Sequence, residues 1–444
     1  MGIRDVVLIL TYIVGLPLSF VEPYVGVLFW TWVGYFNPQE FTWGIASHIP
    51  IALLVALATL SGLVITPRKQ IPPLKLETVL LLLLWAWFCV TTLNVYFAPE
   101  LNHHWIDSIT SWWQVSKILL MIFVAMALVL NSRQVRLWYL VTAGSFAFFA
   151  LKGTVFGFVT SGEDKVYGPK NSMIYDNNDF GLAMNIALPM FVAFARTEKS
   201  KLVRWGFWLS VPMGMVAVIL TYSRGAMLGM AFVVFAMVMR SKRRLLALMI
   251  MALLTLGIFA FAPAQWFERM HTLGNVEQDK SAQARFHSWA FATKLFMDHP
   301  ITGGGFQTFT APLYEHYNML VDKVQGPHSI YFQVLAEHGF PGILLFIALI
   351  ASCLYSCGKL RRNFSRRAGK EHLAAYAEMV QLGLLTFLIS GTFLGRAYFD
   401  LFYQLVATVV VLKVVAQEPD DDLEPKNDGE NYPAVQLEEE ATVS

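Results

Sequence analysis

The chain has 444 residues, of which 56% are hydrophobic and 14% are charged. Apolar runs recur along most of its length, which excludes a soluble enzyme or a nucleic-acid-binding domain and predicts an all-α polytopic membrane protein. The formal net charge of +2 hides an asymmetry, since residues 417–444 carry ten acidic residues and one lysine and the rest of the chain carries +11. We therefore predict a disordered acidic cytoplasmic tail at 417–444, whose role is mainly solvation.

Thirteen apolar stretches are candidate membrane spans. The first two are short, and Pro17 and Pro23 interrupt them, so we expect one broken crossing and about twelve transmembrane helices in total. If both of these stretches cross completely, the number is thirteen. The stretches are 5–20, 24–36, 47–66, 76–98, 114–131, 135–158, 179–195, 205–222, 225–239, 245–262, 329–357, 375–394 and 398–415.

Lysine and arginine gather in every second loop, and short loops rich in these residues stay in the cytoplasm. With twelve crossings, both termini are then cytoplasmic. The basic loops are 68–75, 133–136, 196–204, 240–244 and 359–370. The opposite, exoplasmic face carries 99–113, 160–178, the turn at 223–225, the long segment 263–328 and the turn at 395–398.

Arg224 is the only charged residue in the apolar run from Trp205 to Met239. A single helix of that length would be about 52 Å long, against a hydrocarbon core of about 30 Å, so the run must be two helices. The turn chemistry at 223–225 places Arg224 at or just below the exoplasmic surface, at a cost of up to about 3 kcal/mol. Arg224 then either reaches lipid headgroups or holds an anion at the membrane surface.

The exoplasmic segment 263–328 is too small for a separate domain and too long for a passive connection. Its residues 281–298 predict an amphipathic helix, and Arg285 lies one turn before Trp289, on the same face or at its edge. This helix either rests at the membrane interface or presents Arg285 to an anionic ligand. The predicted apolar stripe consists of Phe286, Trp289, Ala290, Thr293 and Phe296.

Two further features of this segment bear on chemistry. The three glycines at 303–305 allow the backbone to approach a ligand and to offer amide donors to an anion, but a flexible turn explains them equally well. His328 lies at the mouth of the next span. As a neutral imidazole it could accept a proton from a hydroxyl, or it could form a hydrogen bond at the interface.

The acidic residues do not indicate a metal site. Asp176 and Asp179 have no histidine or further carboxylate nearby in sequence, so capping and turn formation are favoured, with Asp179 as the helix cap. Arg396, in the outer turn, is a candidate phosphate ligand or an interfacial anchor beside Tyr398. We predict neither a metal nor another cofactor.

Five motifs, in their order and context, resemble the O-antigen ligase and polymerase superfamily of bacterial envelope glycosyltransferases. They are NNDFG at 177–181, TYSRG at 221–225, Arg285 followed by Trp289, GGGF at 303–306, and PHS at 327–329 with Gly339 and Gly342 beyond it. The first 170 residues resemble the variety associated with exosortase systems, described as O-glycosylation ligases.

The resemblance implies a C-type glycosyltransferase-like bundle with a catalytic cavity on the exoplasmic side. It divides the chain into an N-terminal transmembrane region, 1–170, and a ligase-like catalytic region, 171–416. Such ligases transfer a preassembled glycan from undecaprenyl pyrophosphate to an acceptor hydroxyl, usually on lipid A core, at the periplasmic face of the bacterial inner membrane. The transfer inverts the anomeric centre and needs no metal.

The resemblance also assigns roles by motif position. Arg224 and Arg285 would bind the pyrophosphate, and His328 would be the catalytic histidine. Additional candidates for the site are Asp179, Trp289 and Arg396.

Three alternatives remain open at this point. An O-antigen polymerase would join lipid-linked repeat units, and a protein O-oligosaccharyltransferase would modify a protein hydroxyl, both with the same fold. A lipid or solute transporter would place charges near the bilayer midplane and repeat its spans, and the sequence shows neither feature. The predicted partners are a lipid-linked glycan donor, a glycan or protein acceptor and membrane lipids, without nucleic acid.

Overall fold

The computed structural model of the chain describes residues 2–241, 243–245, 248–249, 280–319 and 324–417. Its elements in these residues are all helices. Eight of the described helices are long and apolar enough to cross a membrane, which confirms a polytopic α-helical membrane protein. Of the remaining predictions, the span at 245–262 and the tail at 417–444 lie almost wholly outside the described residues.

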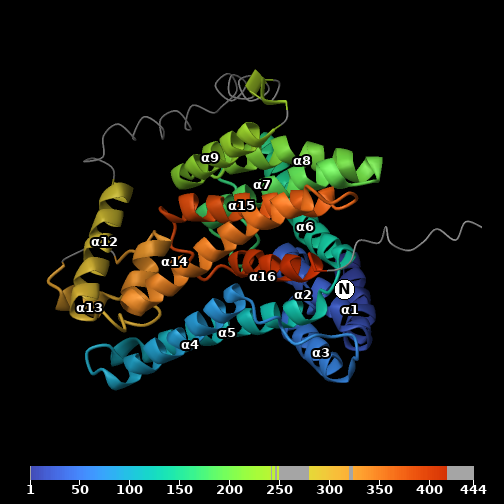
Figure 1. Cartoon of the computed structure of the whole chain (residues 1–444). Coiled ribbons are helices and arrows are strands. Elements are labelled where there is room, and N and C mark those ends of the chain that lie inside the picture. Colours follow the sequence, from blue (N-terminus) through green and yellow to red (C-terminus); the bar gives the residue numbers. More distant parts are fainter. Residues whose placement is uncertain (1, 242, 246–247, 250–279, 320–323, 418–444) are drawn as a thin grey trace, which may run out of the picture.

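Helices follow the predicted spans through both halves of the chain (Figure 1). The first half contains α1 (Ile3–Val21), α2 (Pro23–Phe36), the 3-10 helices η1 (Pro38–Phe41) and η2 (Ile45–His48), α3 (Ile51–Ile65), α4 (Leu76–Phe97), η3 (Asn102–His104), α5 (Trp105–Leu128) and α6 (Ser132–Val159). The second half contains α7 (Asn177–Thr197), α8 (Lys201–Ile219), α9 (Arg224–Arg240), α12 (Lys280–Asp298), α13 (Ala311–His316), α14 (Ile330–Phe364), α15 (Glu371–Gly391) and α16 (Asp400–Val415).

The count of about twelve crossings stays a prediction. Four helices that match predicted spans, α2, α3, α9 and α16, have only 14 to 17 residues. At 1.5 Å per residue such helices are about 21 to 26 Å long, close to the thickness of the hydrocarbon core but below it.

The core of the bundle lies around α7, α15 and α16, whose residues are mostly buried. Figure 1 shows α15 between α9 and α16, and α15 contacts both of them as well as α7. Close approach of these helices depends on small residues. A Cβ added at Gly181 of α7 would come within 2.5 Å of the Ala226 Cβ on α9, and one at Gly229 within 1.9 Å of the Ser390 Oγ on α15.

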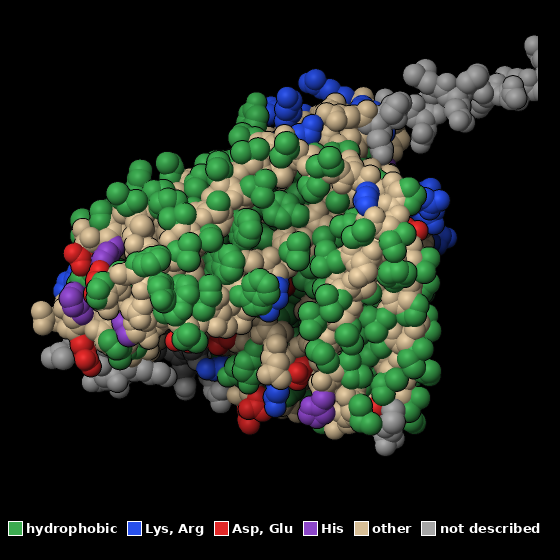
Figure 2. Space-filling model, turned by 90° about the horizontal axis from the view of Figure 1, so that it is seen from below, with side chains coloured by type: hydrophobic (Ala, Val, Ile, Leu, Met, Phe, Trp, Pro, Cys, Tyr) green, Lys and Arg blue, Asp and Glu red, His purple; other side chains and the backbone are tan. Residues whose placement is uncertain are grey.

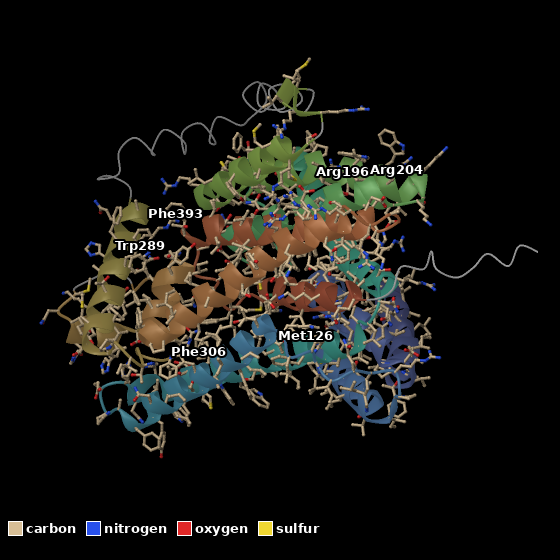
Figure 3. All side chains as sticks on the ribbon, viewed as in Figure 1. Met126, Arg196, Arg204, Trp289, Phe306 and Phe393 are labelled. Carbon is tan, nitrogen blue, oxygen red and sulfur yellow. The ribbon has the colours of Figure 1, made fainter. Side chains whose placement is uncertain are left out.

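We call the two ends of the bundle the motif end and the basic end. The motif end carries α12 and the loops 160–176, 220–223 and 392–399, and the basic end carries the loops 66–75, 198–200 and 365–370 and the end of α16. Trp289, Phe306 and Phe393 are at the left of Figure 3, whereas Arg196 and Arg204 are at the right. Figure 2 shows a broad hydrophobic surface between the two ends of the bundle, with lysine and arginine gathered along its upper right edge. Such a surface fits a surrounding of lipid.

The start of α1 lies at the motif end. The Asp5 carboxylate accepts hydrogen bonds from the backbone N–H groups of Gly44, at 3.1 Å, and Ala46, at 3.4 Å. The same stretch reaches the 160–176 loop, because the Asn37 side-chain amide donates to the Lys170 carbonyl oxygen at 2.8 Å. The N-terminal end of α1 is therefore close to the loop that precedes α7.

The junction between α1 and α2 lies at the basic end. Glu22 pairs with Arg68 at 3.9 Å, and the Tyr24 hydroxyl donates to the Gln134 carbonyl oxygen at 2.8 Å. The two helices are thus antiparallel and run between the two ends of the bundle, which agrees with the thirteen-crossing alternative. This arrangement disagrees with one broken crossing and with both termini at one end of the bundle, because Pro23 begins a new helix at a position where its missing N–H costs nothing. The side of the membrane on which each terminus lies stays a prediction.

Candidate functional site

The NNDFG and TYSRG motifs contact each other directly. The Asn177 side-chain amide donates to the Thr221 carbonyl oxygen at 2.7 Å, and that of Asn185, two turns along α7, donates to the Ala226 carbonyl oxygen at 2.7 Å. Carbonyl groups around the break between α8 and α9 therefore find partners on α7, which fixes the start of α9. Without such partners this break in an apolar run would leave buried acceptors unpaired.

Arg224 is the first residue of α9, and it is half-buried. The turn itself lies at 220–223, slightly earlier than the predicted 223–225, since the Ser223 side chain caps α9 by accepting from the Ala226 N–H at 3.2 Å. Tyr222 takes a left-handed backbone conformation, with φ of 55°, and its hydroxyl donates to the Gly162 carbonyl oxygen. Arg224 thus lies at the positive end of the α9 helix dipole, and its guanidinium charge and the dipole both attract an anion.

Asp176, not Asp179, caps α7. The Asp176 carboxylate accepts from the Asn178 N–H at 2.9 Å, whereas buried Asp179 forms an ion pair with Arg396. The predicted cap at Asp179 is therefore wrong, because a buried carboxylate in the first turn is stabilised better by a guanidinium from another loop. No cluster of three or more His, Cys, Asp or Glu side chains with metal-binding geometry occurs within the described ranges.

Trp289 joins α12 to the PHS motif. Its indole N–H donates to the Pro327 carbonyl oxygen at 3.0 Å, and its ring stacks on Phe332 of α14, with centroids 5.1 Å apart. The predicted apolar stripe of α12 is not the face that packs on the protein, since Phe286 is 54% exposed. The buried face instead consists of Ser288, Phe291, Ala292 and Leu295, which follow the same helical period one register away.

The loop after α15 lies between Arg224 and His328. A Cβ added to Gly225 would lie 3.2 Å from the Phe393 Cβ. A Cβ added to Gly395 would lie 2.9 Å from the Pro327 Cγ and 3.2 Å from the backbone nitrogen of His328. Figure 3 places Phe393 at the same end of the molecule as Trp289. This loop, which also carries Arg396, therefore connects the start of α9 to the PHS motif.

His328 lies between charges of opposite sign. Burial lowers the pKa of its imidazole, the positive charge of Arg285 lowers it further, and the negative charge of Asp176 opposes both. Its Nε2 lies 3.3 Å from the Gln325 Oε1. With the N–H on Nε2 donated to this oxygen, Nδ1 keeps its lone pair and can accept a proton.

The glycines at 303–305 do not offer free amides to a ligand. The N–H groups of Gly304 and Gly305 donate to the carbonyl oxygens of Ala336 and Glu337 at 2.8 Å each. These carbonyl groups are available as acceptors because α14 is interrupted at Gly339, where φ is 63°. The prediction of an anion-binding loop is therefore wrong, and the glycines instead allow the chain to enter the break in α14.

Sequence reasoning missed Glu337 on α14, which is 2% exposed. Its carboxylate accepts hydrogen bonds from the Gln307 N–H, at 3.0 Å, and from the Tyr398 hydroxyl. It therefore ties the glycine segment and the loop after α15 to α14. An acidic residue within an otherwise apolar span was a signal that could have identified it.

The comparisons with known proteins agree with this arrangement of motifs. Residues 205–347 match the O-antigen ligase family, and residues 3–199 match a family of unknown function, DUF5935. A search of curated proteins finds no match for the chain. The O-antigen ligase match includes Arg224, Arg285 and His328 and thus the helices and loops that bring the motifs together. Residues 205–347 therefore place the chain in the O-antigen ligase superfamily, and this membership supports a ligase or polymerase type of function.

Proposed function

We propose that the protein is an O-antigen ligase-type glycosyltransferase. It transfers a preassembled glycan from undecaprenyl pyrophosphate to an acceptor hydroxyl, most favourably on a lipid A core sugar. The observation that carries the proposal is that the Arg285 guanidinium lies near enough to His328 to lower its pKa, at the end of the bundle where Arg224 begins α9. A cation beside a neutral imidazole suits a reaction that needs both anion binding and proton acceptance.

In this reaction the guanidinium groups of Arg224 and Arg285 hold the pyrophosphate oxygens. Planar guanidinium groups bind phosphate through paired hydrogen bonds, and undecaprenyl pyrophosphate is an anion at the membrane surface. The bond from the anomeric carbon to the pyrophosphate oxygen breaks, and negative charge grows on the departing pyrophosphate. Fixed cations stabilise that charge more in the transition state than in the ground state.

His328 acts as the general base. The acceptor hydroxyl attacks the anomeric carbon on the face opposite the pyrophosphate, and its proton passes to Nδ1 of His328. The new glycosidic bond then has inverted configuration, and undecaprenyl pyrophosphate leaves. In this scheme two guanidinium groups perform the charge stabilisation for which other glycosyltransferases use a divalent metal.

The site faces the periplasm in this proposal. The positive-inside rule assigns the basic end to the cytoplasm, so the motif end lies at the outer surface of the inner membrane. An undecaprenyl-linked donor that has been translocated across the membrane presents its pyrophosphate at that depth. Trp289 and Arg396 position the PHS motif and the start of α7 around it.

Reconstituted transfer tests the proposal. The purified protein in liposomes, with undecaprenyl pyrophosphate-linked glycan and lipid A core, should form the conjugate in the presence of a metal chelator, as measured by mass spectrometry. Arg224→Ala, Arg285→Ala and His328→Ala should each reduce transfer by about a hundredfold or more. Arg204→Ala, at the basic end, is the matched control and should retain activity.

The product also separates the alternatives within the superfamily. Longer undecaprenyl-linked chains would identify a polymerase, and a glycosylated protein would identify a protein O-oligosaccharyltransferase. Undiminished transfer by Arg224→Ala and Arg285→Ala would refute the assignment of the pyrophosphate site.

A further inference from the structure

A cavity of about 640 Å³ lies at the motif end between the N-terminal helices and α6, apart from His328. Its walls come from the start of α1, the stretch 40–43, α6, the loop 165–170 and the first turn of α7. All five walls belong to the part of the chain that matches DUF5935, residues 3–199, and none belongs to the ligase match at 205–347. The cavity is therefore built by a region to which the ligase match assigns no role.

The cavity carries an excess of positive charge. Its lining contains the cationic residues Arg4, Lys152, Lys165 and Lys170 and a single carboxylate, Glu40. The described parts of the chain provide no ion-pair partner for Lys152 or Lys170 within 4.0 Å, and the Glu40 carboxylate accepts from the side chain of Asn171 at 2.9 Å. A wall of this composition favours an anionic ligand.

Aromatic rings supply the rest of the lining. The Lys152 ammonium lies 5.0 Å from the centre of the Phe41 ring, and the Arg4 guanidinium lies 5.1 Å from that of Trp43. Tyr167 and Tyr175 stack on each other with centroids 5.9 Å apart, and both are about half exposed. Flat aromatic faces beside cations suit a ligand with sugar rings and an anionic group, because sugar C–H faces pack on aromatic rings.

The depth of the cavity points to a ligand held in the membrane. Lys152 lies seven residues before the end of α6, or about 10 Å along the helix axis. Its helix neighbours Leu151, Val155 and Phe156 are 45%, 50% and 40% exposed, so this side of α6 faces lipid. A lysine at that depth is costly unless an anion or water meets its charge.

The cavity also adjoins the candidate active site. Tyr175 and Phe180 line it, and these residues flank Asp176, which interacts with His328, and Asp179, which pairs with Arg396. The first turn of α7 therefore contributes both to the cavity and to the charged pairs around His328 and Arg396. A position next to this turn suits the acceptor, which must reach His328 while the donor occupies the arginines.

We propose that this cavity binds the phosphorylated saccharide head of a membrane-anchored acceptor. Lys152 and Lys170 contact the phosphate, and the aromatic rings contact the sugars. The role as acceptor rests on the proposed function, whereas binding itself can be measured without transfer.

Binding to the protein in phosphatidylcholine nanodiscs tests the site. The probes are a lipid-anchored glucosamine disaccharide with phosphate, the same glycolipid without phosphate, and soluble glucosamine 1-phosphate. The phosphorylated glycolipid should bind best, and Lys152→Gln with Lys170→Gln should weaken it at least about tenfold, as expected for a lost charge-assisted hydrogen bond. Lys201→Gln at the basic end is the matched control and should leave binding unchanged.

Transfer kinetics provide the second measurement. The double variant should raise the KM for the acceptor and leave the KM for the donor unchanged. Equal weakening by the control variant, or equal competition by phosphatidylglycerol, would overturn the proposal. Binding of soluble glucosamine 1-phosphate as tight as that of the glycolipid would also overturn the membrane-anchored assignment. Absence of transfer by the wild type with intact binding would instead count against the proposed function alone.

Discussion

The acid–base behaviour of His328 depends on two residues from separate motifs. Burial and Arg285 lower the pKa of His328, and Asp176 raises it, so that the imidazole is mainly neutral at neutral pH. A base must be unprotonated to act, and the rate should fall as the pH decreases through this lowered pKa.

Asp176→Asn should move the acid limb of the kcat profile to lower pH. Removal of the negative charge destabilises the imidazolium, so the pKa of His328 decreases further. Asparagine caps helices as well as aspartate does, so α7 should keep its first turn. The pH dependence of kcat measures the shift, and Asp164→Asn, on the exposed part of the loop, is the control. A shift to higher pH would contradict the assignment of His328 as the base.

At the scale of the helices, the glycines of α7 and α9 determine where Arg224 lies. Gly181→Ala would push a Cβ to 2.5 Å from that of Ala226, so α9 has to move. We expect a loss of about 1–3 kcal/mol in the free energy of unfolding and a large loss of transfer. Gly206→Ala on α8 meets nothing within 4 Å and should be neutral.

Thermal unfolding in detergent, together with the transfer rate, tests this expectation. Equal melting temperatures and equal rates for Gly181→Ala and Gly206→Ala would show that the helix contact does not control the site.

Trp289→Phe should separate positioning from binding. Phenylalanine can still stack on Phe332, but it cannot donate to the Pro327 carbonyl oxygen. The PHS motif would lose one of its fixed points, and we expect kcat to fall about tenfold while the KM for the donor changes little. Met297→Leu, an exposed position on the same helix, is the control. A change confined to the donor KM would show that Trp289 contacts the substrate instead.

These helices also show how far the sequence leads. The length of the apolar run alone required a turn near Arg224, and the amphipathic pattern of 281–298 predicted α12 with its last residue, Asp298, at the observed position. The buried face of α12 could not be predicted, because Ser288 is satisfied by the Ala284 carbonyl oxygen and by the distant carbonyl oxygen of Gln325. The partners of the glycine amides could not be predicted either, because these carbonyl groups are available only where α14 is interrupted at Gly339.

At the scale of the whole molecule, the two helices at the start of the chain determine its topology. They run antiparallel between the two ends of the bundle, so residue 3 lies at the motif end, and 369 lies in the basic loop at the other end. The positive-inside rule could not reveal this from two short proline-containing stretches, because the rule orients spans but does not count them.

Cysteine labelling in intact cells tests the topology. Ile3→Cys should react with a maleimide that does not cross the inner membrane, whereas Gly369→Cys should react only after that membrane is disrupted. A background with Cys89→Ser is suitable, since Cys353 and Cys357 are buried. Protection of the cysteine at 3 in intact cells would place the start of α1 in the cytoplasm and contradict the antiparallel passes.

The break in α14 at Gly339 has a consequence for how the lipid-linked donor arrives. The segment around Gly304 and Gly305 is anchored in that break by backbone hydrogen bonds, and the Phe340 N–H donates to the Pro300 carbonyl oxygen at 2.8 Å. Displacement of this segment from the break would break these backbone hydrogen bonds together and leave several buried backbone groups unpaired. The polyprenyl chain of the donor should therefore enter laterally, between helices from the surrounding bilayer, rather than from the aqueous side.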